Sequence, residues 1–120
     1  MRIYLDSAIL IYWVEGNLSF VPKITLWLSQ PQVIQVVSEL SRLECRVKPL
    51  RDRNLIVLQA FDHYFANIVT SVVPLSRAIV NEATRIRAER GFKTPDALHL
   101  AAAFVHNCDV FLTHDLRLSS

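Results

Sequence analysis

Residues 2–8 of the chain read RIYLDSA: a mostly apolar run, one aspartate, and the start of a second apolar run. Residues 2–5 predict a short buried strand, and residues 8–15 predict a helix that stops at Gly16. Asp6 therefore lies where a strand gives way to a helix. A lone aspartate there often just caps the helix, but Ser7 competes for that role and leaves Asp6 available for another.

Three further acids, far apart in the sequence, occupy comparable positions. Glu44 lies in the helix expected after the β-branched strand 33–37, Asp96 lies in the first turn of a helix that Thr94 and Pro95 open, and Asp115 follows a strand at 109–112. The carboxyl ends of parallel strands share one edge of a sheet, so these acids can meet in one pocket. Clustered carboxylates need a counter-charge, and hard cations such as Mg²⁺ or Mn²⁺ prefer oxygen ligands. The pattern predicts a metal-dependent enzyme that acts on phosphate.

The remaining residues alternate between the two kinds of element. We expect helices at 20–28, from a Ser38 cap to about residue 48 before Pro49, at 51–68, from a Ser76 cap to Gly91, and at 94–107, with a strand at 71–75 and a turn at 116–118. Strands that alternate with helices predict an α/β fold with a largely parallel sheet. A chain of 120 residues is expected to form a single domain, residues 1–120.

Composition narrows the class of protein. A hydrophobic fraction of 52% argues against disorder, and no apolar run reaches the roughly 18 residues that span a bilayer. The start of the chain does not resemble a secretion signal, so we expect a cytoplasmic protein. Cys45 and Cys108 form no metal-binding pair and are expected to be free, buried thiols. The net charge of +2 does not itself indicate a nucleic-acid binder, although basic clusters at 42–53 and 85–93 could hold a polyanion.

Glu44 borders the buried face of its helix. Leu40, Leu43 and Val47 have the spacing of a buried stripe, and a glutamate beside such a stripe needs a partner. Glu39 lies in the first turn, where any acid is stabilised by the helix dipole. We therefore expect a functional role for Glu44 and a structural one for Glu39.

Asp96 and Asp115 also have simpler interpretations, as a first-turn acid and as a turn residue. Among the histidines, His99 lies one turn beyond Asp96 and is expected in the core or beside the acids, and His114 adjoins Asp115. His63 and His106 are expected at the surface. With two glycines in the chain, a glycine-rich phosphate loop is excluded.

Four segments in this order resemble the acidic motifs of PIN domains, and in particular those of bacterial VapC-type toxins. They are residues 3–8 (IYLDSA), 38–44 (SELSRLE), 94–101 (TPDALHLA) and 111–115 (FLTHD), and they span nearly the whole chain. The resemblance implies a three-layer α/β/α fold with a short, mainly parallel central sheet of about four strands. It also implies an endoribonuclease dependent on Mg²⁺ or Mn²⁺, a homodimer, and inhibition by a small cognate antitoxin that inserts at the acidic pocket.

Carried over residue by residue, the resemblance makes Asp6 and Asp96 the principal metal ligands, with Glu44 and Asp115 completing the quartet directly or through water. One or two cations would then activate water and stabilise the phosphate. Side chains expected beside the metal or the phosphate are Ser7, where the family commonly has threonine, Thr113, and His114, where it often has asparagine. Arg46, Lys93 and Arg117 are the residues expected to contact the RNA backbone.

Two other classes of function stay open at this point. A phosphotransfer receiver domain also has an acidic pocket on an α/β fold, but the phosphorylatable aspartate and the nearby acidic pair it requires are not found. A non-catalytic PIN-like module would bind RNA or an antitoxin without cutting. Family members usually continue into another strand beyond Ser119 and Ser120, and a shortened sheet edge would expose a pairing surface.

Overall fold

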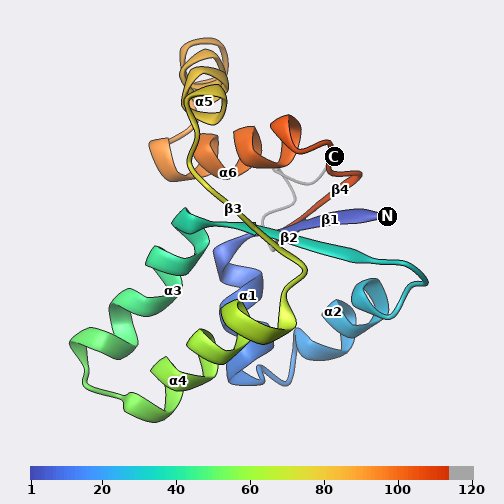
Figure 1. The fold of residues 1–120 in the computed structure, drawn as a ribbon, viewed down its shortest axis with the longest axis vertical. Coiled ribbons are helices and arrows are strands. Elements are labelled where there is room, and N and C mark those ends of the chain that lie inside the picture. The colour runs from blue at the N-terminus through green and yellow to red at the C-terminus, as the bar shows by residue number, and fades with distance from the viewer. Residues whose placement is uncertain (114–120) are drawn as a thin grey trace.

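The computed structural model describes residues 1–113, in which strands and helices alternate (Figure 1). The elements are β1 (Arg2–Leu5), α1 (Ser7–Glu15), α2 (Val21–Leu28), β2 (Ile34–Ser38), α3 (Glu39–Arg51), α4 (Leu55–His63), the π-helix η1 (Tyr64–Ile68), β3 (Ser71–Val73), α5 (Arg77–Arg90), α6 (Thr94–Val105) and β4 (Val110–Leu112). The turn expected at 116–118 lies outside the described residues. None of the helices within residues 1–113 has the length and apolar character to cross a membrane.

The strands form one sheet in the order β3-β2-β1-β4. Every pair of neighbours is parallel, with Ile3 opposite Gln35 on one side of β1 and opposite Val110 on the other. The chain thus builds β1, β2 and β3 outward in one direction and then adds β4 at the opposite edge. The predicted α/β fold with a four-stranded parallel sheet is confirmed.

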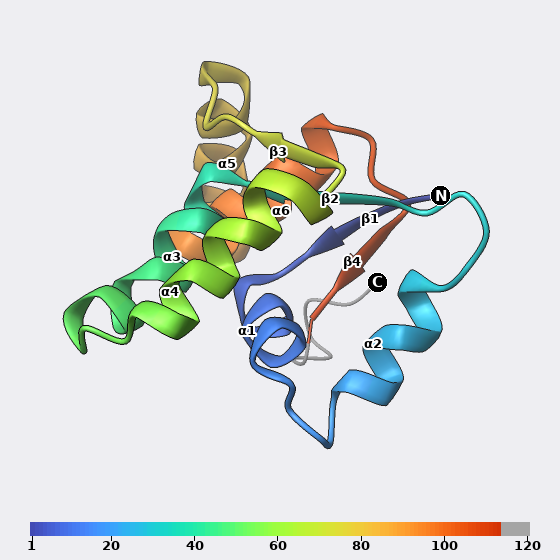
Figure 2. The same ribbon diagram turned by 60° about the horizontal axis from the view of Figure 1, so that its bottom comes forward.

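Two apolar cores flank the sheet because side chains alternate along each strand. On β1, Ile3 and Leu5 belong to the core that α1, α2, α3 and α4 cover. Tyr4 points to the opposite face, where α5 and α6 cover a second core rich in alanine. Figure 1 and Figure 2 show the sheet between these two groups of helices. The small residues of α6, Ala97 and Ala101–Ala103, are all buried and let the helix approach the sheet closely.

Several helix ends follow the predicted capping chemistry. The Ser38 hydroxyl accepts a hydrogen bond from the Ser41 amide, and the Ser41 hydroxyl accepts one from the Ser38 amide. Ser76 caps α5 in the ordinary way, through the Ile79 amide. Gly16 and Gly91 end α1 and α5 in the left-handed region, with φ of 75° and 71°, where glycine has no Cβ penalty.

Two predicted helices differ from the observed ones. The helix expected to stop before Pro49 continues to Arg51, because a proline ring there removes only one helical hydrogen bond and is itself buried. The helix expected at 51–68 instead starts at Leu55, after Asn54 caps the Val57 amide. It ends at His63 and continues as the π-helix, which the Val69 amide closes on the Tyr64 carbonyl at 3.0 Å.

The buried stripe predicted on α3 is wrong. Leu43 and Val47 are 58% and 49% exposed, whereas the buried positions are Ser41, Cys45 and Pro49. The capping bonds between Ser38 and Ser41 fix the rotation of the helix at its start, and that rotation turns the small residues inward. Packing of helix on sheet therefore overrides the apolar spacing.

One predicted cap and one predicted helix end are also wrong. Ser7 is the first residue of α1 and not its cap, and Asp6 occupies the N-cap position without a capping side-chain bond. Thr94 is the first residue of α6, whose N-cap is Lys93, and the helix ends at Val105, before the predicted residue 107. Cys45 and Cys108 are free thiols, as predicted, although Cys108 is only half-buried.

Candidate active site

Asp6 and Thr113 follow β1 and β4, which are neighbours in the sheet. The Thr113 hydroxyl donates to Asp6 Oδ2 at 2.8 Å, and the Asp6 amide donates to the Leu112 carbonyl at 3.1 Å. Ligands of open α/β sheets bind at such a point, where the strand order reverses at the carboxyl edge. Because its side chain caps no helix amide, Asp6 is available to a ligand at this edge.

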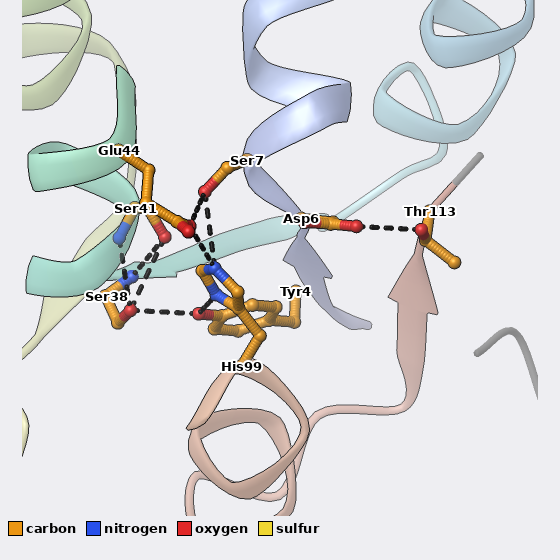
Figure 3. A network of polar contacts seen from close by, with 8 residues as sticks. All are labelled: Tyr4, Asp6, Ser7, Ser38, Ser41, Glu44, His99 and Thr113. Atoms are coloured by element: carbon orange, nitrogen blue, oxygen red, sulfur yellow. Dashed lines mark hydrogen bonds and ion pairs between the residues drawn. The ribbon is translucent and has the colours of Figure 1, made fainter. Parts of the chain in front are cut away.

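Glu44 reaches the same edge from the middle of α3. Its Oε1 atom accepts a hydrogen bond from the Ser7 hydroxyl at 2.7 Å and lies 2.6 Å from Nε2 of His99 (Figure 3). Partial burial raises the pKa of the Glu44 carboxyl, but the hydrogen bonds from His99 and Ser7 outweigh burial and hold the pKa below its usual value. Glu44 is therefore an ionised carboxylate at neutral pH, and it has the partner that a glutamate in this position was expected to need.

His99 links Glu44 to the interior of the molecule. The histidine is 2% exposed, and its Nδ1 lies 2.6 Å from the hydroxyl of Tyr4, which is fully buried. Tyr4 also donates to the Ser38 hydroxyl at 3.0 Å. Burial raises the pKa of the Tyr4 phenol, and the charges of Asp6 and Glu44 add to the rise. The predicted place of His99, in the core beside the acids, is the one observed.

Asp96 lies in the first turn of α6, three residues before His99, and is half-buried. Residues with this spacing share one face of a helix. Asp96 therefore lies on the same face of α6 as the histidine that contacts Glu44. The strand end that carries Asp6, the α3 position of Glu44 and the start of α6 all meet at one end of the sheet.

Of the remaining predicted site residues, the structure describes Arg46 and Lys93. Asp115, His114 and Arg117 lie outside the described residues. Arg46 forms an ion pair with Asp62 at 2.7 Å, whereas Lys93 is exposed at the N-cap of α6.

The sequence did not point to Tyr4, Ser38 and Ser41 as parts of this network. Tyr4 reads as an ordinary apolar strand residue, Ser38 reads as a helix cap, and Ser41 reads as an ordinary residue of the following helix. A signal was nevertheless present, because a tyrosine buried in a central strand needs a partner for its hydroxyl group.

The donor set suits a hard divalent cation, since Asp6, Glu44 and Asp96 offer carboxylate oxygens. Both hydrogen bonds to Glu44 fall on Oε1. Within residues 1–113, however, no three acidic, histidine or cysteine side chains are close enough together to form a metal site. The carboxylate oxygens of these residues are thus ligands of the kind that a divalent cation prefers. The fourth predicted ligand, Asp115, lies outside the described residues.

Comparison with known proteins gives a consistent family and fold. The sequence profile of the PIN domain matches residues 3–120. No curated protein matches this chain by sequence.

Solved structures with a similar fold include two from bacterial toxin systems at a TM-score of 0.78. VapBC2 of Rickettsia felis, bound to a promoter DNA fragment, is 13% identical over 98% of this chain and 90% of its own. VapC20 of Mycobacterium tuberculosis, described as a toxin that cleaves the sarcin-ricin loop, is 14% identical over 97% and 92%. A toxin-antitoxin complex from Klebsiella pneumoniae is 23% identical over 96% and 88%, with a TM-score of 0.66. Because all three sequence identities are below 25%, these similarities establish the fold of this chain and nothing more.

Proposed function

The chain belongs to the PIN domain family, and on that premise we propose that it is a metal-dependent endoribonuclease, the toxin of a toxin–antitoxin pair. It would hydrolyse RNA phosphodiester bonds in the cytoplasm. The observation that supports this most is the convergence of side chains from the end of β1, from α3 and from α6 on a single edge of the sheet. One of the solved structures with this fold is described as a toxin that cleaves the sarcin-ricin loop, which fits the proposal.

The proposed cation ligands are Asp6, Glu44, Asp96 and Asp115. When bound, Mg²⁺ or Mn²⁺ supplies positive charge that stabilises a phosphate and makes water more acidic. The protein's part is to hold the carboxylates in place. Thr113 fixes one oxygen of Asp6, and Ser7 and His99 fix one oxygen of Glu44. We expect the exposed Lys93 to contact the RNA backbone beside Asp96.

The proposal is tested by incubating a structured RNA with the purified chain and Mg²⁺ or Mn²⁺. EDTA should abolish cleavage. Asp96→Asn and Glu44→Gln should each slow it by about a thousandfold, because a cation supplies several kcal/mol of charge stabilisation. Glu39→Gln is the matched control, since Glu39 is an exposed glutamate of the same helix. Cleavage that survives both EDTA and Asp96→Asn would contradict the proposal.

An antitoxin is the protein partner we propose. Two solved structures with this fold come from toxin–antitoxin complexes. A groove between α1, α3 and α4 begins beside Glu44 and is lined by Ile11, Cys45 and Val57. The outer face of α3 carries the exposed apolar residues Leu43, Val47 and Leu50, and exposed apolar groups of this kind mark interaction surfaces.

The test of this partner uses a peptide encoded by a short reading frame next to the gene. The peptide should inhibit cleavage by the wild type, and Leu43→Asp with Val47→Asp should weaken that inhibition without changing cleavage itself. Light scattering of the free chain should give the mass of the proposed homodimer. A monomeric mass would contradict the homodimer alone.

One observation favours a second function, a PIN-like module that binds RNA or an antitoxin without cutting. No three candidate metal ligands come together within residues 1–113. In that case RNA binding would be unaffected by EDTA, and no cleavage products would form with either cation.

A further inference from the structure

A chain of buried polar groups lies behind Glu44. It runs from Ser41 and Ser38 through Tyr4 to His99, and each of these four residues is at most 2% exposed. Of these four residues, the proposed nuclease site uses only His99, which holds one oxygen of Glu44. Buried polar groups are costly unless every one is hydrogen-bonded, and no buried side-chain nitrogen or oxygen atom among the described residues is left without a partner.

Nε2 of His99 faces the carboxylate of Glu44. A carboxylate oxygen accepts hydrogen bonds, so Nε2 donates across the 2.6 Å contact with Oε1. The other nitrogen, Nδ1, lies 2.6 Å from the Tyr4 hydroxyl, which is also in contact with the Ser38 hydroxyl at 3.0 Å. Tyr4 therefore holds the ring from behind, and Nε2 points at Glu44.

The two donors to Glu44 come from opposite sides of the sheet. Ser7 lies on α1, in the layer that also contains α3, and His99 lies on α6, in the other layer (Figure 3). Both bonds end on Oε1, and no residue within 1–113 forms a hydrogen bond to Oε2. A flexible glutamate side chain is thereby held with one oxygen occupied and the other left to accept a ligand.

We propose that His99 is a positioning residue for the metal site, held by Tyr4 and acting through Glu44. This inference rests on the proposed function, because it takes Glu44 to be a cation ligand. His99 itself contacts neither cation nor RNA. Partners that orient a ligating carboxylate typically contribute 10- to 100-fold to metal affinity.

The first experiment measures Mn²⁺ binding by calorimetry in the full chain. His99→Leu removes the donor and should weaken binding by about 10- to 100-fold. His99→Gln keeps an N–H group at nearly the same reach and should restore most of the affinity. His63→Leu is the matched control, because His63 is exposed and bonds only to Asn67 among the described residues. Thermal unfolding monitored by circular dichroism verifies that each variant is folded.

A kinetic comparison separates positioning from a loss of structure. In His99→Leu, the Mn²⁺ concentration that gives half of the maximal cleavage rate should rise by the same factor as the dissociation constant, while kcat at saturating Mn²⁺ should stay within a fewfold of wild type. A variant that is merely destabilised would lose kcat at every Mn²⁺ concentration, and that result would overturn the positioning role.

A spectroscopic measurement tests the contact without metal or RNA. The buried imidazole N–H should give a proton NMR signal protected from solvent exchange. The signal should vanish in His99→Gln and shift in Glu44→Gln. Absence of the signal in wild type would overturn the contact and the role built on it.

The two proposals fail in different ways. If the wild type binds no Mn²⁺ and leaves RNA intact, the proposed function is overturned. If the wild type binds Mn²⁺ and cleaves RNA, but His99→Leu binds Mn²⁺ as tightly as wild type does, only the positioning role is overturned.

Discussion

Replacing Ile79 by alanine should destabilise the protein by about 3 kcal/mol. Ile79 is fully buried in the core between the sheet and α5–α6, and only Ile79 and Ala83 of α5 are buried. The change removes three carbon atoms, worth about 2.4 kcal/mol of apolar burial, and a cavity that stays open adds up to about 2 kcal/mol. The higher helix propensity of alanine returns a few tenths of a kcal/mol.

Val80 offers the matched control, because it follows Ile79 in the same helix and is 47% exposed. In Val80→Ala the smaller loss of burial is balanced by helix propensity, so stability should change by no more than about 0.5 kcal/mol. The assay is urea unfolding monitored by circular dichroism, with the free energy of unfolding taken from the midpoint and slope. Equal losses in the two variants would refute the assignment of α5's buried face.

Four shorter predictions follow. Gly16→Ala should cost about 1 kcal/mol in thermal unfolding, because φ is 75° and an added Cβ meets no atom within 4 Å, so only the left-handed backbone is penalised. Thr113→Val removes the donor to Asp6 and should weaken Mn²⁺ binding about tenfold in calorimetry, with the melting temperature little changed. Lys93→Ala should weaken RNA binding and reduce the slope of log affinity against log salt by about 0.7, as for one lost phosphate contact. Burial raises the pKa of the Tyr64 phenol, so above pH 10, the usual pKa of a phenol, the unfolded chain releases a proton that the folded chain keeps. The free energy of unfolding, measured with urea, should therefore fall as the pH rises through this range. It should fall less in Tyr64→Phe, which has no phenol to ionise.

The sequence predicts most of the fold because its local signals agree with its packing. The strand at 2–5 and the caps at Ser38, Ser76, Gly16 and Gly91 are all observed, since each depends on backbone chemistry within a few residues. The errors arise where packing decides. Pro49 continues α3 because its ring is buried, and Leu43 and Val47 face solvent because Ser41 sets the helix rotation.

In the candidate site, too, some residues could be predicted from local sequence and others could not. Asp6 could be named because a carboxylate directly after a strand has a predictable place at the sheet edge. Glu44 could be named because a glutamate beside the buried face of a helix needs a partner. Their partners could not, because Tyr4 meets His99 across 95 positions of sequence, and no local pattern encodes that contact. Whether Asp115 joins the other acids stays a prediction, as it lies outside the described residues.

The geometry of Glu44 makes the site depend on both cores at once. Its carboxylate is held by Ser7 from one helical layer and by His99 from the other, with Tyr4 of the central strand behind the histidine. Loosening of either layer therefore releases the same carboxylate. It follows that Ile79→Ala, although it contacts none of these groups, should lower the Mn²⁺ affinity measured near its own unfolding midpoint, whereas Val80→Ala should not at the same temperature. Equal affinities of the two variants under those conditions would show that α6 holds His99 without help from α5, and the link between the second core and the site would then be wrong.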